Sequence, residues 1–211
     1  MEISASEVMR YLGGSTDGQR ISALVKDLTA EITSHSAPKN VYGIWDCDVD
    51  SLSVKIAGII INSENLAGHL RGCYRAVLLA ATLGTEADTL IRRYSIQDME
   101  KAVIAQAVCT AMIEAYCDWA EGEIAKTREL AGLCGTRRYS PGYGDFDIGW
   151  QKEFVNLLNC DRRIGLALTS GYMLVPSKSI TAIIGYSEEK KYNGNKCSDC
   201  GSEQCGFREK E

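Results

Sequence analysis

Residues 137–145 read Arg-Arg-Tyr-Ser-Pro-Gly-Tyr-Gly-Asp and hold the residue types in this chain that are best suited to binding a small ligand. Pro141, followed by two glycines that flank Tyr143, favours a tight and rigid turn that exposes backbone N–H groups and one aromatic ring. Arg138 precedes the turn and offers a planar set of donors suited to a carboxylate or a phosphate. We therefore predict a binding turn here. The alternative is an ordinary surface turn, with Tyr143 packed and Arg138 solvated.

A second group with potential chemistry is the cysteine cluster Cys197, Cys200 and Cys205 near the C-terminus. A Cys-x-x-Cys pair lets two thiolates bind one metal, and a third thiol makes most of a tetrahedral zinc site or three ligands of an iron–sulfur cluster. The alternative is a tail with reduced thiols or a redox-sensitive pair. A fourth ligand would come from solvent, from a partner, or from another thiol of the chain, namely Cys47, Cys134 or Cys160.

Several kinds of catalytic site lack their sequence signatures. The only histidines are His35 and His69, and the chain contains neither HExxH nor GxSxG, which disfavours a hydrolase. The glycines of a Rossmann site and of a Walker phosphate loop are also missing. We interpret His69 as an ordinary polar residue on a short helix.

Composition indicates a globular protein, with 45% hydrophobic and 24% charged residues in 211 positions. The net charge of −5 argues against a nucleic-acid partner. The apolar runs are shorter than the roughly 18 to 20 residues that span a bilayer, and the start does not resemble a secretory signal. We therefore expect a cytoplasmic protein without a membrane partner, whose nine cysteines are reduced apart from any metal-bound ones.

The hydrophobic pattern predicts an α+β fold with an antiparallel sheet, because helices and strands do not alternate as βαβ units. Helices are expected over residues 4–12, 21–32, 63–71, 98–130 and 154–158. Strands are expected over 41–47 and 51–62 as a hairpin, over 76–83, and over 165–175 and 179–186 as a second hairpin. The long helix at 98–130 has an apolar face rich in small residues, among which Cys109 and Cys117 are expected in the core. The composition becomes polar after residue 186, so the predicted domain is 1–186 and the cysteine-containing tail is 187–211.

The pattern Arg138-x-x-Pro141-Gly142-Tyr143 follows the long Ala-rich helix and precedes an apolar strand pair. In this setting it resembles the S-adenosylmethionine-binding activation domain of cobalamin-dependent methionine synthase, and most closely the free-standing versions of that domain. Four further stretches support the resemblance by their order along the chain: residues 69–73, 78–84, 139–145 and 163–172. In the fused enzymes the turn continues as Gly-Tyr-Pro, whereas here Gly144 and Asp145 follow the tyrosine.

The resemblance implies a single C-shaped α+β domain with a twisted antiparallel sheet, flanking helices and one long helix. It also implies an accessory role in reactivating a separate methionine synthase. In that family cob(II)alamin, carried by the partner's cobalamin-binding domain, takes one electron from a donor such as flavodoxin, and the methyl group comes from S-adenosylmethionine. Such a protein is the activation component of a methyltransferase and not a complete enzyme alone. The missing acid–base residues fit this role, because displacement at a sulfonium by a strong nucleophile needs positioning and no proton transfer.

The same resemblance implies roles for the residues of the turn. Arg138 would bind the carboxylate of the methionine moiety, and Pro141, Gly142 and Tyr143 would contact the adenosine and methionine parts. An aromatic face near a sulfonium adds about 0.5 to 2 kcal/mol, so we expect Tyr143 to contribute to recognition of the cation.

Three acidic residues complete the predicted site. Either Glu121 or Glu123, late on the long helix, would supply the family's acidic contact; the alternative is a solubilising surface charge. Asp145 would hold an amino or ribose group, or would instead begin the helix over residues 148–158.

Two other functions compete with this hypothesis. The first is a reactivator of a different corrinoid methyltransferase. The second is a metal-binding interaction module that acts through the cysteine tail, with the α+β body as its scaffold.

Overall fold

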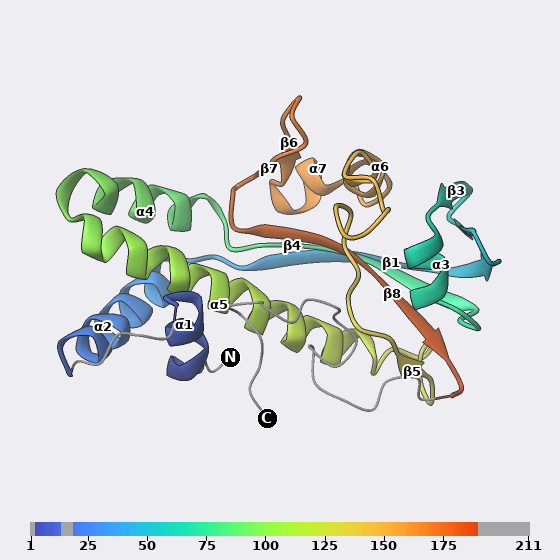
Figure 1. The fold of residues 1–211 in the computed structure, drawn as a ribbon, viewed down its shortest axis with the longest axis horizontal. Helices are drawn as coiled ribbons and strands as arrows, with labels where there is room; N and C mark the ends of the chain where they lie inside the picture. The colour runs from blue at the N-terminus through green and yellow to red at the C-terminus, as the bar shows by residue number, and fades with distance from the viewer. Residues whose placement is uncertain (1–2, 14–18, 190–211) are drawn as a thin grey trace.

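The computed structural model describes residues 3–13 and 19–189 of the chain (Figure 1). Within them lies a twisted six-stranded sheet of order β3-β2-β1-β4-β8-β5, in which all neighbouring strands are antiparallel. The strands β6 (Ala167–Leu168) and β7 (Leu174–Val175) form a separate small sheet. The strands of the main sheet are β1 (Lys39–Val49), β2 (Ser53–Ile56), β3 (Ile59–Asn62), β4 (Arg75–Thr82), β5 (Cys134–Gly135) and β8 (Ser179–Ser187).

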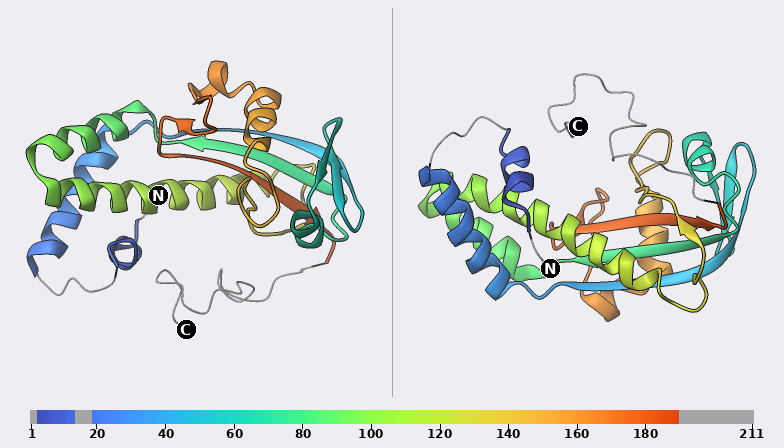
Figure 2. Two further views of the ribbon diagram at one scale, coloured as in Figure 1. Left: turned by 45° about the horizontal axis from the view of Figure 1, so that its top comes forward. Right: turned by 90° about the horizontal axis from the view of Figure 1, so that it is seen from below.

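The helix α5 (Met99–Ile124) is the longest element and packs against one face of the sheet (Figures 1 and 2). Asp98 begins it by accepting a hydrogen bond from the backbone N–H of Lys101. Its buried face consists largely of alanines and other small residues, so neighbouring backbones approach it closely. Three helices pack on it: α1 (Ala5–Tyr11), α2 (Gln19–His35) and α4 (Thr85–Gln97).

The central strand β4 is buried on both faces, and its side chains point alternately into two hydrophobic cores on opposite faces of the sheet. Val77 and Leu79 join Ile124 of α5 in one cluster. Ala76 and Leu78 belong to the opposite cluster, which also includes residues of α3 (Glu64–His69), α6 (Trp150–Leu157) and α7 (Cys160–Ile164). The sheet is therefore a layer between α5 and the three shorter helices, and the chain between α5 and α6 must pass from one layer to the other.

The predicted α+β class, the antiparallel sheet and the long helix are confirmed. The five predicted helices correspond to α1, α2, α3, α5 and α6, and the strand at 76–83 corresponds to β4. The first hairpin is present as β1 and β2, although residues 51–62 contain a second turn at Ala57 and Gly58, whose φ angles are 51° and 81°. The buried positions of Cys109 and Cys117 are confirmed as well.

Other predictions about the elements were wrong. Residues 165–175 do not pair with 179–186; they fold on themselves as β6 and β7, because Thr169 and Met173 close a turn through the bond from Thr169 N to Met173 O at 2.9 Å. The strand β8 pairs instead with β4 and β5.

The long helix ends at Ile124, six residues before the predicted 130, and short turns follow it. The helices α4 and α7 were not predicted. The strand β8 includes Ser187, and the predicted tail from residue 190 onward lies outside the described residues.

Gly185 lets the end of α3 approach β8. An added Cβ there would lie 2.7 Å from Cys73 Sγ and 2.7 Å from Leu70 Cδ2. We expect Gly185→Ala to lower the free energy of unfolding by about 1–3 kcal/mol in urea denaturation. The control is Gly122→Ala in α5, where the added Cβ has no described atom within 4 Å apart from the adjoining residues and the backbone of its own helix. That change should be neutral or stabilising by up to about 1 kcal/mol, and equal losses in both variants would contradict the packing.

Candidate functional site

The Arg138 side chain contacts a cluster of three acidic side chains on α5. Its Nη1 contacts the carboxylate of Glu121, and its Nη2 lies 2.8 Å from Glu114 Oε2 and 2.8 Å from Asp118 Oδ1. The three acids follow one another at spacings of four and three residues, which places them on one face of the helix. Among these four groups, three carboxylates and one guanidinium leave a formal charge of −2.

The Arg138 side chain is only 11% exposed, so its charge interacts through a medium with less screening than water. Burial opposes the charge on the guanidinium, but the attraction of Glu121, Asp118 and Glu114 outweighs burial and raises the pKa of Arg138. Burial also raises the pKa of the neighbouring Cys117 thiol to about 12, so that this group stays protonated at neutral pH. The cluster is therefore a site of fixed charges without a reactive thiol.

The predicted turn is present and presents Tyr143 to solvent with 61% of its surface exposed. Backbone bonds close it: Gly142 N donates to Phe146 O at 2.7 Å, and Phe146 N donates to Tyr143 O at 2.9 Å. Gly142 and Gly144 have φ angles of +99° and +55°, a region that favours glycine. Pro141 is buried at the base of the turn.

Tyr139 attaches the start of the turn to the sheet and to α3. Its backbone forms a bridge with Ile183 of β8, with N···O distances of 2.9 and 2.8 Å. Its ring packs against His69 and Phe146, with centroids 4.9 and 6.2 Å away. His69 Nε2 lies 2.9 Å from the carbonyl oxygen of Arg137, and because a carbonyl only accepts, this nitrogen donates. Sequence reasoning placed His69 on a short helix but did not predict this contact.

Asp145 lies at the N-terminus of α3 and not at the start of α6, which begins at Trp150. Its carboxylate accepts bonds from the Ser63 hydroxyl at 2.5 Å and from the Glu64 backbone N–H at 2.7 Å. The bond from Ser63, together with the backbone N–H groups, holds the pKa of Asp145 below its ordinary value. The structure thus brings Asp145 to α3 and gives it partners that the sequence did not indicate.

Of the two acids proposed on α5, the structure brings only Glu121 to Arg138. Glu123 is 50% exposed and pairs with Lys126 at 2.6 Å. The direct contacts of these residues with a ligand, and those of Arg138 and the turn, stay predictions.

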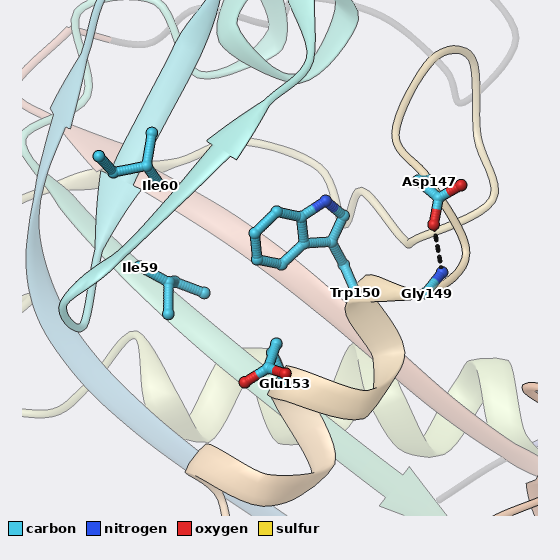
Figure 3. Close-up of a pocket in the computed structure, with 6 residues that line it drawn as sticks. All are labelled: Ile59, Ile60, Asp147, Gly149, Trp150 and Glu153. Atoms are coloured by element: carbon cyan, nitrogen blue, oxygen red, sulfur yellow. Dashed lines mark hydrogen bonds between the residues drawn. The ribbon is translucent and has the colours of Figure 1, made fainter.

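Two hollows lie close to the turn. One, of about 460 Å³, is formed where the indole ring of Trp150 stands between α6 and β3 (Figure 3); its lining is Ile59, Ile60, Asp147, Gly149, Trp150 and Glu153. The other, of about 740 Å³, includes His69 and the end of β8 in its lining. Neither lining includes a predicted site residue, and neither hollow was predicted from the sequence.

The described residues contain no group of three or more His, Cys, Asp or Glu placed to hold a metal ion. Cys197, Cys200 and Cys205 lie outside the described part of the chain. Of the thiols suggested as a fourth ligand, Cys160 is buried, and burial raises its pKa to about 12, which disfavours the thiolate that a metal needs. Over residues 3–13 and 19–189, none of the helices has the length and apolar character of a membrane span.

These features define the class of the protein as an α+β domain in which a charge cluster and an exposed aromatic turn lie on one segment at the edge of an antiparallel sheet. Residues 74–209, which include α5 and the turn, match the family described as "Vitamin B12 dependent methionine synthase, activation domain", and the chain belongs to this family.

The fold agrees with this assignment. A solved structure of the MetH reactivation domain bound to AdoHcy is similar with a TM-score of 0.65 and 17% sequence identity, covering 92% of this chain and 79% of that one. At this identity the likeness shows a shared fold. A comparison with curated proteins gives no match.

Arg138→Ala should destabilise the fold, because it removes the guanidinium that three neighbouring carboxylates share. We expect the free energy of unfolding to fall by about 1–3 kcal/mol. The matched control is Arg75→Ala, which removes a single pair with Asp46, whose side chain is 84% exposed; the expected loss is below about 1 kcal/mol. Urea denaturation compares the two, and a smaller loss for Arg138→Ala would contradict the buried cluster.

Asp145 should titrate below its ordinary value of 3.8 in the folded protein. Its folded pKa is lowered, so the stability it contributes is present above the unfolded pKa and is lost as the pH falls through the folded pKa. Carboxyl ¹³C NMR measures this pKa directly. Ser63→Ala removes the largest cause and should raise the pKa toward the ordinary value; an unshifted pKa in the wild type would refute the contact.

Proposed function

We propose that this protein binds S-adenosylmethionine and supports the reductive methylation of cob(II)alamin on a separate cobalamin-dependent methionine synthase. The observation that supports this most is the position of the Arg138 cluster and the exposed Tyr143 turn within the residues that match the activation-domain family. AdoHcy, bound in the solved domain of similar fold, is S-adenosylmethionine without its methyl group.

The charges of the cluster suit this ligand. S-adenosylmethionine has a carboxylate, an ammonium and a sulfonium, so its net charge is positive. We assign the carboxylate to Arg138 as a charge-assisted pair. The ammonium is assigned to Glu121, because of the two acids predicted from the sequence it is the one that contacts Arg138. Arg138 already contacts three carboxylates, so ligand binding must exchange one of these contacts or share the guanidinium.

The turn is assigned to the reacting end of the ligand. Pro141 and Gly142 would contact the adenosine and methionine parts through backbone groups, and the exposed ring of Tyr143 would face the sulfonium. The partner's cobalamin, once reduced by one electron, supplies the nucleophile that takes the methyl group. The bond from sulfur to methyl breaks and the sulfur keeps its electron pair. Because no proton moves, the chain needs only to hold the donor in line with its acceptor.

The remaining parts of the role rest on the family and on the sequence pattern, and not on the geometry of the site. They are the cobalamin-binding domain of methionine synthase as partner, an electron donor such as flavodoxin, and the cytoplasm as location. Service to another corrinoid methyltransferase, and zinc or an iron–sulfur cluster at Cys197, Cys200 and Cys205, stay predictions. Metal analysis of the purified chain tests the second of these.

Calorimetric titration with S-adenosylmethionine tests the proposed site. The wild type should bind, and Glu121→Gln should weaken binding by about tenfold, which is about 1.4 kcal/mol. Glu123→Gln is the matched control on the same helix, since Glu123 pairs only with Lys126 among the contacts described, and it should change the dissociation constant less than twofold.

A wild type that does not bind would refute the proposed function, and equal effects of the two glutamine variants would refute the choice of Glu121. The partner is tested by adding the chain to a methionine synthase that lacks its activation domain. Recovery of methylated cobalamin should require the chain, S-adenosylmethionine and a reductant together.

A further inference from the structure

The short helix α3 holds both ends of the segment that contains Arg138 and Tyr143. At its C-terminal end, His69 Nε2 donates to the carbonyl oxygen of Arg137 at 2.9 Å. At its N-terminal end, Ser63 and Asn65 contact Asp145. The helix is itself fixed to the core, because Leu66 and Leu70 are fully buried. One rigid element therefore determines where the segment begins and ends.

The contact at Asp145 is reciprocal. The carboxylate accepts bonds from the Ser63 hydroxyl at 2.5 Å and from the backbone N–H groups of Glu64 and Asn65 at 2.7 and 3.2 Å. In return the backbone N–H of Asp145 donates to Asn65 Oδ1 at 3.1 Å. Ser63 also caps its own helix by accepting from the backbone N–H of Leu66 at 3.0 Å. Side chain and backbone of Asp145 are thus both held.

Gly144 allows this close approach. Its φ is +55°, and an added Cβ would lie 2.3 Å from Asn65 Oδ1. A side chain at position 144 would therefore be strained by the positive φ and would collide with Asn65, so the contact between Asp145 and α3 requires glycine here.

We propose that Ser63, Asn65 and Asp145 form a lock, here called the α3 lock, that positions the Tyr143 turn for ligand binding. Its residues are positioning residues: Ser63 and Asn65 act through Asp145 on the backbone next to Tyr143. The consequence for ligand binding rests on the proposed function. The effect on the conformation of the turn does not, so the two are measured separately.

The experiment compares Ser63→Ala and Asn65→Ala with the wild type by amide hydrogen exchange and by titration with S-adenosylmethionine. We expect the amides of residues 142–146 to exchange about tenfold faster and the dissociation constant to rise about five- to tenfold in each variant. Ser63→Thr keeps the hydroxyl and should restore both values to within about twofold of the wild type.

The matched control is Asp88→Asn. Asp88 holds Ser177 in the same manner, accepting from its backbone N–H at 2.7 Å and its hydroxyl at 2.5 Å, but it lies on α4, at the opposite end of the molecule from α3 (Figure 1). It should change stability without changing the exchange of residues 142–146 or the affinity.

Each outcome of these measurements either supports or refutes a part of the proposal. Faster exchange with weaker binding supports the lock. Faster exchange with unchanged affinity shows that the lock does not position the site, and unchanged exchange shows that it does not hold the turn. If the wild type fails to bind S-adenosylmethionine, the proposed function and the binding part of this proposal both fail, while the exchange data still report on the turn. An effect of Asp88→Asn equal to that of Asn65→Ala would attribute the losses to general destabilisation and overturn the proposal.

Discussion

The ion cluster between Arg138 and α5 is the contact on which the site depends. A guanidinium that is only 11% exposed needs anionic partners, and Glu114, Asp118 and Glu121 supply them from one face of the helix. Successive side chains of an extended segment point to opposite sides, so the arginine faces α5 while Tyr139 packs in the opposite core. The segment therefore ties the two layers of the domain together at the edge of the sheet.

The rest of the fold makes this segment rigid. The bridge between Tyr139 and Ile183 attaches it to β8, and Phe146 anchors its end in the core, where the ring is 1% exposed. Between these two anchors the chain has only a few residues, and two glycines with positive φ bend it outward. Tyr143 is thus an exposed ring on a fixed support. A ligand that contacts a preorganised group of this kind costs little conformational entropy on binding.

The elements that were predicted correctly are rich in apolar residues. The many small apolar residues of α5 and the continuous apolar run of β4 follow from the sequence because burial leaves a direct record in residue type. The hairpin of β8 with residues 165–175 was wrong because adjacency in sequence does not determine pairing. The helix α4 was missed although Ala87, Leu90, Ile91 and Tyr94 have helical spacing.

The site was predictable in part. The turn and its exposed tyrosine follow from proline and glycine chemistry, which is local. The partners of Arg138 and Asp145 lie 17 to 24 residues and 80 to 82 residues away in sequence, and only the packing of α5 and α3 brings them into contact. The same reason explains why the sequence left Glu121 and Glu123 as alternatives: their difference is one of orientation on a helix whose neighbours were unknown.

A crystal structure of the chain with S-adenosylhomocysteine tests the central claim most directly. The account predicts that the ligand's sulfur lies beside the ring of Tyr143 and that its carboxylate is paired with Arg138, with α3 still bound to Asp145. A ligand bound in the hollow beside Trp150, or in any place without contact to Arg138 and Tyr143, would contradict it.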